Sequence, residues 1–340
     1  MKKRILISNL VAFVMVLTLI MIPSMIPPAI AAELRAVSAW PTHTPQTYWY
    51  HEFIKEANDR AQKEGVPLTI KKLGGPEVVG MMQQFGAMRS GTVDMVYTSG
   101  DYFSGETIEL GALGCIRPEP MLELQAWRET KVMEILNEAL REKSGCLALC
   151  PILMGRGFTL LSTKPIKPGD WSGLKIRSIG GITAVGVPAM GGASMLIPPA
   201  EAFEALQRGV IDAVLGAASD RYAWGERGVY KYILMPRFFE SSTYWFISAK
   251  AWDGLPENIK SFLKKVAYDL EEKGLPWCRK WDEDTIVKFM REEKVKLVWC
   301  SPEEERKIAK AFRENYLETV AKKSPKHGAK IYEILKGYIY

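Results

Sequence analysis

The amino-acid sequence predicts an α/β fold of two lobes with a cleft between them and C-terminal helices packed across both. Strand and helix signals alternate in residues 33–155, and the same rhythm returns in residues 156–240. Residues 241–340 add a strand and then mostly helical patterns. Alternation of this kind predicts parallel sheets covered by helices on both faces. About 308 residues follow an N-terminal export signal, enough for two domains that each bury a core.

The N-terminal residues 1–32 have the order of a secretory signal peptide. Positive charge in residues 1–4 precedes an almost uncharged apolar run, residues 5–22, which ends at a proline. Small residues at 29–32 suit signal peptidase, so we expect the mature chain to begin near Ala32 or Glu33. An uncleaved membrane anchor is the alternative, because about 18 apolar residues can just span a bilayer. The apolar run is not followed by a cysteine at a lipidation position.

Net charge and cysteine count narrow the class of protein further. Loss of the signal removes three Lys/Arg and no acid, which lowers the formal net charge of +6 to about +3. So small and dispersed a charge argues against nucleic acid as a partner and is compatible with an anion site. Five cysteines remain, an odd number that leaves at least one unpaired if disulfides form. Cys146 and Cys150 share one face of a predicted strand and are expected in the core, while a disulfide involving Cys115 or Cys146 stays open.

Periodicity and turn residues give the elements in order. In the first lobe we expect strands at 34–39, 68–73, 93–98 and around 146–150, a helix at 46–64, and a helix from Pro76 that is stopped by Gly91. In the second lobe we expect strands at 158–162, 174–177, 194–197 and 211–215, a helix opened by Gly180-Gly181, and a helix from Pro198 to Gly209. A strand at Tyr244-Trp245 returns to the first lobe, and helical patterns follow from Pro256 to Tyr340. Clefts between such lobes are where small ligands bind.

Five motifs occur in one order along the mature chain. They are Ala39-Trp-Pro-Thr-His-Thr-Pro45, Met88-Arg-Ser-Gly-Thr-Val-Asp-Met95, Lys164-Pro-Ile-Lys-Pro-Gly-Asp-Trp-Ser-Gly-Leu-Lys-Ile-Arg177, Gly191-Gly-Ala-Ser-Met-Leu-Ile-Pro198 and Glu201-Ala-Phe-Glu-Ala-Leu-Gln-Arg-Gly-Val-Ile-Asp-Ala213. Each motif is weak alone. In this order and after an export signal, they resemble the extracytoplasmic solute-binding subunits of TRAP transporters, the DctP-type proteins, over nearly the whole mature chain.

The resemblance implies a periplasmic-binding-protein-like fold that closes on a ligand and delivers it to membrane permease subunits driven by an ion gradient. It also implies that Arg177, at the end of the Gly-Leu-Lys-Ile-Arg strand, grips the carboxylate of a small organic acid. Physical chemistry supports this role, because a guanidinium fork matches both carboxylate oxygens. An arginine at the carboxyl end of a strand also points into the crevice where α/β sheets hold ligands. The alternative is a surface arginine paired with Asp170 or another acid.

Other candidate residues are expected around the same cleft. Arg156 is expected to supply a second polar contact from the junction of the lobes, the alternative being a solvent-facing arginine between glycines. Gly180 could direct backbone N–H groups toward an anion at a helix start, or form only a tight turn. The remaining candidates are the aromatic residues Trp40, Phe158 and Phe239, for which a place in the core is the alternative, and the loop residues Ser99 and Asp101.

The sequence departs from better-known patterns after Ile211-Asp-Ala213. Sialic-acid-binding relatives carry Glu and Asn there, and keto-acid binders carry Glu-Trp, whereas this chain has Val214-Leu-Gly216. The difference argues against sialic acid and against a metal-assisted keto-acid site. An apolar stretch here predicts a ligand with a hydrophobic body. Asp220 and Arg221 follow shortly and are not assigned to the site.

Two other classes of protein compete with a binding protein. A secreted enzyme is disfavoured, because the chain lacks His-Glu-x-x-His, Gly-x-Ser-x-Gly and Gly-Lys-Ser/Thr motifs and has three histidines without zinc-ligand spacing. A ligand-binding sensor would need a signalling domain or a retained anchor. We therefore expect a periplasmic, non-enzymatic binding protein without cofactor or metal. A homodimer through the C-terminal helices stays open.

Overall fold

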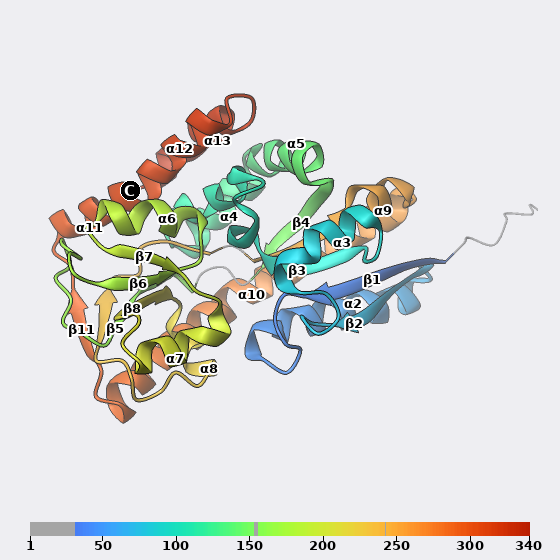
Figure 1. The fold of residues 1–340 in the computed structure, drawn as a ribbon. Coiled ribbons are helices and arrows are strands. Elements are labelled where there is room, and N and C mark those ends of the chain that lie inside the picture. The colour runs from blue at the N-terminus through green and yellow to red at the C-terminus, as the bar shows by residue number, and fades with distance from the viewer. Residues whose placement is uncertain (1–30, 153–155, 242) are drawn as a thin grey trace, which may run out of the picture. The chain divides into compact units, whose positions relative to one another are not determined.

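The strands of the protein form two separate sheets in the computed structural model, which describes residues 31–152, 156–241 and 243–340 (Figure 1). The expected signal peptide lies almost entirely outside the described residues. Within the described ranges, none of the helices is long and apolar enough to cross a membrane. We use "first lobe" for the sheet β2-β1-β3-β10-β4 with its surrounding helices, and "second lobe" for the sheet β11-β9-β5-β8-β6-β7 with its own.

The first sheet is mixed rather than parallel. Its strands are β1 (Ala32–Ser38), β2 (Leu68–Gly74), β3 (Met95–Ser99), β4 (Cys146–Ile152) and β10 (Thr243–Ser248). β1 and β3 are parallel, as expected, but β10 runs antiparallel to both β3 and β4. β10 enters from the second lobe instead of through a βαβ crossover, so the rule that makes such strands parallel does not apply to it. It is buried along its whole length.

The second sheet is also mixed. Its strands are β5 (Thr159–Ser162), β6 (Lys175–Ser178), β7 (Ala193–Leu196), β8 (Ala213–Gly216), β9 (Tyr232–Met235) and β11 (Lys296–Trp299). β6 is parallel to its neighbours β7 and β8, whereas β5 is antiparallel to β8 and β9. The expectation of a parallel arrangement therefore holds only for part of this sheet.

The elements that were not predicted include two strands, and one expected helix begins later than predicted. β9 was missed, and the expectation of helix alone after Pro256 was wrong at β11, a four-residue edge strand whose half-exposed residues show no alternation of burial. The helix expected from Pro76 begins later, with a 3-10 turn η2 (Met81–Gln83) followed by α3 (Gln84–Ser90). The Glu77 side chain instead accepts a hydrogen bond of 2.7 Å from the Gly75 N–H, which closes a turn.

Helices cover both sheets and connect them (Figure 1). They are α2 (Tyr48–Glu64), α4 (Pro120–Arg128), α5 (Val132–Ser144), α6 (Gly181–Ala189), α7 (Ala202–Gln207), α8 (Ala218–Ala223), α9 (Ala249–Gly254) and α10 (Glu257–Glu292), with 3-10 helices η3 (Gly100–Phe103) and η4 (Ile108–Cys115). α10 is a single helix of 36 residues that continues through Pro276. It contacts α2 and β4 of the first lobe and α8 of the second.

The C-terminal helices pack across both lobes, as expected. α11 (Pro302–Ala309), a π-helical turn (Lys310–Glu314), α12 (Asn315–Lys323) and α13 (Gly328–Leu335) follow one another. α12 contacts η4 of the first lobe and α6 of the second, and α13 contacts η4 and α5. Phe312 fits so closely against Gly186 of α6 that a β-carbon on Gly186 would lie 2.3 Å from its ring. The glycine therefore allows the tail to approach the second lobe.

Candidate functional site

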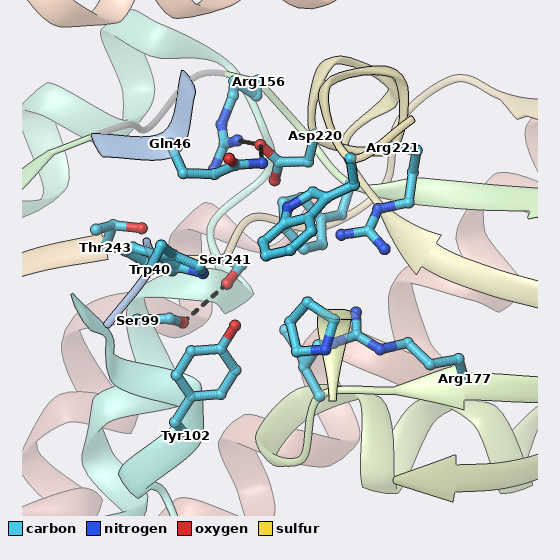
Figure 2. Close-up of a pocket in the computed structure, with 14 residues that line it drawn as sticks. Trp40, Gln46, Ser99, Tyr102, Arg156, Arg177, Asp220, Arg221, Ser241 and Thr243 are labelled. Carbon is cyan, nitrogen blue, oxygen red and sulfur yellow. Dashed lines mark hydrogen bonds and ion pairs between the residues drawn. The ribbon is translucent and has the colours of Figure 1, made fainter. Parts of the chain in front are cut away.

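Residues of both lobes line a pocket that leaves about 30 Å³ for the centres of water-sized molecules, or about 430 Å³ when all space between its atoms and its open mouth is counted (Figure 2). The lining residues are Trp40, Gln46, Ser99, Tyr102, Arg156, Phe158, Arg177, Ile179, Pro199, Asp220, Arg221, Trp224, Ser241 and Thr243. Many of them lie at or just beyond the carboxyl ends of β1, β3, β6 and β8. Ligand sites of α/β sheets usually form at this edge, because loops with diverse side chains meet there.

Arg177 extends from β6, the strand between β7 and β8, and reaches the pocket from the second lobe (Figure 2). Its side chain is only 2% exposed, and its Nε donates a hydrogen bond of 2.9 Å to the Ile197 carbonyl. Among the described residues, no carboxylate lies within ion-pair distance of its guanidinium. Burial, and then the nearby positive charge of Arg221, lower the pKa of Arg177 to about 10. The pocket thus contains a buried cation that an anionic ligand would stabilise.

Arg156 is buried at the junction of the lobes rather than exposed to solvent. Its Nη1 forms an ion pair with Oδ1 of Asp220, which lies in α8. The same oxygen accepts a hydrogen bond of 3.3 Å from Nε2 of Gln46, which precedes α2 (Figure 2). Asp220 therefore connects the second lobe to a residue of the first lobe.

Arg221, next to Asp220 in α8, also lines the pocket. Its Nη1 lies 2.8 Å from Oε1 of Glu226, a fully buried carboxylate that also accepts a hydrogen bond from the Tyr230 hydroxyl. Sequence reasoning considered Asp220 and Arg221 without assigning them to the site. Their position just after β8, at the carboxyl edge of the sheet, is the signal that could have placed them there.

Uncharged polar side chains form the side of the pocket opposite Arg177 and Arg221 (Figure 2). Ser99 and Ser241 have their Oγ atoms 3.2 Å apart, and the Ser241 hydroxyl donates a hydrogen bond of 2.7 Å to Oδ2 of Asp101. Burial raises the pKa of Asp101 to about 7. The Tyr102 hydroxyl, which interacts with the Trp40 side chain, completes this side together with Thr243.

Five of the eight candidate residues from the sequence line this pocket: Arg177, Arg156, Trp40, Phe158 and Ser99. Gly180 lines a neighbouring apolar groove instead, and its φ of +91° shows a turn that favours glycine before α6 begins. Phe239 lies in the core, stacked on Phe312 with ring centroids 5.6 Å apart.

The apolar stretch in β8 does not form a wall of the pocket. Val214 and Leu215 are fully buried in the core, so the apolar contact expected from that strand is absent from the residues lining this pocket. The apolar surface comes instead from the rings of Trp40, Phe158 and Trp224, together with Ile179 and Pro199. Nowhere in the described ranges do three or more His, Cys, Asp or Glu side chains group closely enough to hold a metal ion.

Comparison with known proteins places the chain in a family. Residues 37–323 match the model of the DctP family, described as bacterial extracellular solute-binding protein, family 7. A solute-binding protein of Albidiferax ferrireducens is 26% identical over 216 residues, which are 61% of this chain and 62% of the relative. In that match the chain spans less than two thirds of the relative's own length.

Solved structures of low sequence identity share the fold. A TRAP periplasmic solute-binding protein from Desulfovibrio salexigens, with bound orotic acid, superposes with a TM-score of 0.78 at 15% identity, over 90% of this chain and 98% of that one. Another from Rhodoferax ferrireducens, with bound malonate, has a TM-score of 0.77 at 20% identity, over 90% and 98% of the two chains. Because the family model covers most of the sequence and the two-lobe fold agrees with it, the chain belongs to the DctP family of bacterial extracellular solute-binding proteins.

Proposed function

We propose that this protein is the extracytoplasmic solute-binding subunit of a TRAP transporter and captures a small organic acid through Arg177. The observation that carries the proposal is a buried guanidinium without a carboxylate partner among the described residues, in a pocket lined by both lobes. The solved relatives from Desulfovibrio salexigens and Rhodoferax ferrireducens contain orotic acid and malonate, and both ligands carry a carboxylate. The captured acid would pass to a permease driven by an ion gradient.

The physical basis is a charged pair formed with a buried guanidinium. A carboxylate would receive two parallel N–H bonds from the guanidinium, which fix its direction as well as adding affinity. The positive charge of Arg177 is already desolvated, so the protein bears that cost before the ligand arrives. Since the pocket has walls from both lobes, a ligand touches all of them only when the lobes are together, and its binding energy favours the closed arrangement. Such a cycle requires binding and release, without a catalytic step.

Calorimetry and thermal shift with aliphatic, aromatic, hydroxy and keto acids test this function. At least one acid should raise the melting temperature of the wild-type protein, and Arg177→Gln should weaken its binding by about 100-fold, because a charged bidentate pair is lost. Arg208→Gln is the matched control, since it removes the same charge from a side chain that is 74% exposed. Tight binding of a neutral sugar that is indifferent to Arg177→Gln would refute the proposal.

We also propose that residues 1–32 direct export and are removed. The support is the order of charge, apolar run and small residues at the N-terminus. The intact mass of the protein from the periplasmic fraction should correspond to a start near Ala32 or Glu33. A mass that includes residues 1–32, with the protein in the membrane fraction, would instead identify a retained anchor.

A homodimer through the C-terminal helices stays a prediction. The aromatic side chains of the tail that suggested it include Phe312 and Tyr316, and both are buried within the chain itself. A dimer would therefore have to use other residues of these helices. Light scattering on the purified protein at several concentrations decides between a monomer and a dimer.

A further inference from the structure

We infer that the pocket selects monocarboxylates with an uncharged, hydrogen-bonding body, and that the buried carboxylate of Glu226 enforces this selection by neutralising Arg221. The inference rests on the proposed function and names the substrate class of the same site. It also goes against the hydrophobic ligand body that the sequence alone predicts.

The pairing of the three arginines in the pocket limits the charge of the ligand. Arg156 is paired with Asp220, and Arg221 is paired with Glu226 at 2.8 Å. For Arg177 the part of the chain that the structure describes offers no carboxylate partner. Among the described residues, one of the three guanidinium groups therefore has no carboxylate in ion-pair contact, and a single carboxylate on the ligand would supply that contact.

A second carboxylate on the ligand would find no further arginine without a carboxylate partner. Near Asp220 it would meet a negative charge that already occupies Arg156. To reach Arg221 it would have to share that side chain with Glu226, or displace it and leave a fully buried carboxylate without its partner. Breaking a buried ion pair in this way is strongly unfavourable. Dicarboxylates and phosphate monoesters are therefore expected to bind poorly.

The first lobe supplies hydrogen bonds but no charge to the ligand body. Its lining residues are Trp40, Gln46, Ser99, Tyr102, Ser241 and Thr243, all uncharged (Figure 2). Hydroxyl groups can both donate and accept, so they suit a hydroxyl, carbonyl or amide on the ligand. An ionised group at this end would lose its water without gaining a counter-ion.

Glu226 determines this selectivity without lining the pocket itself. It is fully buried behind Arg221 and accepts hydrogen bonds from Arg221 and the Tyr230 hydroxyl. Among the described residues, Glu226 is the carboxylate in ion-pair contact with Arg221, through its Nη1. Removal of that negative charge would leave Arg221 as a second anchor for an anion.

The test compares acids with their monoamides, which differ in the charge of one end and little in size. The probes are malonate and malonamate, succinate and succinamate, and glutarate and glutaramate, titrated calorimetrically into the wild type, Glu226→Gln and Tyr230→Phe. In the wild type at least one monoamide should bind ten or more times tighter than its diacid. In Glu226→Gln the ratio of monoamide affinity to diacid affinity should be at least tenfold lower than in the wild type, or inverted. Tyr230→Phe removes the other hydrogen bond to Glu226 while keeping its charge, so it should retain the wild-type preference.

The outcomes separate this inference from the proposed function. A diacid that binds the wild type more tightly than its monoamide, and that depends on Arg177, overturns the inference while the proposed function stands. Absence of binding by all six probes also overturns it, whereas the proposed function fails only if the wider panel of acids fails. A folded Glu226→Gln variant with an unchanged ratio overturns the role of Glu226. If that variant does not fold by circular dichroism, the wild-type ratio alone decides the substrate class.

Discussion

A β-carbon placed on Gly181 would lie 2.8 Å from Oδ1 of Asp101, so the two residues approach more closely than any side chain on Gly181 would permit. Gly181 begins α6 in the second lobe, and Asp101 belongs to η3 in the first lobe. The Asp101 carboxyl group thus lies against the first residue of α6. The two lobes are in contact here, beside the ligand pocket.

Gly181→Ala should weaken ligand binding by about tenfold, because the added methyl group pushes η3 away from α6 and opposes the approach of the lobes. Gly65→Ala is the control for backbone strain. Gly65 has a φ of +66° but open space around its β-carbon position, so alanine there costs about 1 kcal/mol of stability without disturbing a contact between lobes. Calorimetry with the tightest-binding acid measures the loss of affinity, and urea unfolding measures the loss of stability. Equal affinities of the wild type and Gly181→Ala would show that this contact does not contribute to closure.

Asp101→Asn should remove part of the pH dependence of stability. Burial raises the pKa of Asp101 from 3.8 to about 7, so the folded state holds a proton that the unfolded state releases. This contribution is fully present below pH 4 and is lost as the pH rises toward 7. Relative to the wild type, the variant should gain roughly 2–4 kcal/mol in the free energy of unfolding between pH 4.5 and pH 8. Urea unfolding across this range measures it, and parallel curves for both proteins would contradict the assignment.

The fold was predictable from the sequence where local pattern and tertiary structure agree. The strand ending in Arg177 and the helix opened by Gly181 both appeared near their expected places, because glycines and alternating apolar residues mark them. β11 has no such signal: its four residues pair with β9 only because α10 carries the chain back to the second sheet. The sequence likewise did not predict strand direction, since β10 takes its antiparallel place by pairing with β3, a segment about 150 residues earlier.

The candidate site was predictable where a motif identifies a single residue. Arg177 was found in this way, whereas Arg156 was expected from its place at the junction of the lobes; both line the pocket. Gln46 and Tyr102 were missed, because they reach the pocket from two separate segments of the first lobe, and their approach to Arg177 depends on the arrangement of the lobes. Phe239 is an aromatic residue of the kind that often lines pockets. Its antiparallel backbone bridge with Phe158 instead places its side chain in the core. A sequence pattern does not contain that information.

The cysteine thiols should be almost unreactive in the folded protein. All five are free; four are buried, and Cys300 is half-buried. Burial raises the pKa of Cys278 and of Cys300 to about 12, which leaves almost no thiolate at neutral pH. With a disulfide reagent at pH 7.5, we expect less than about one equivalent to react quickly before denaturation and about five afterwards. A lower final count would indicate disulfides in the exported protein.

Arg177→Met should make the ligand-free protein more stable while abolishing acid binding. Burial disfavours the charged guanidinium in the folded state, as its lowered pKa of about 10 indicates, so the arginine destabilises the fold at every pH below that value. Methionine fills similar space without charge, although the hydrogen bond to the Ile197 carbonyl is lost. We expect a gain of about 1 kcal/mol, or about 2 °C in melting temperature, without ligand. With saturating acid the order should reverse, because only the wild type gains stability from binding. If the ligand-free variant is less stable than the wild type, Arg177 stabilises the fold through its contacts by more than its buried charge destabilises it, and the prediction is wrong.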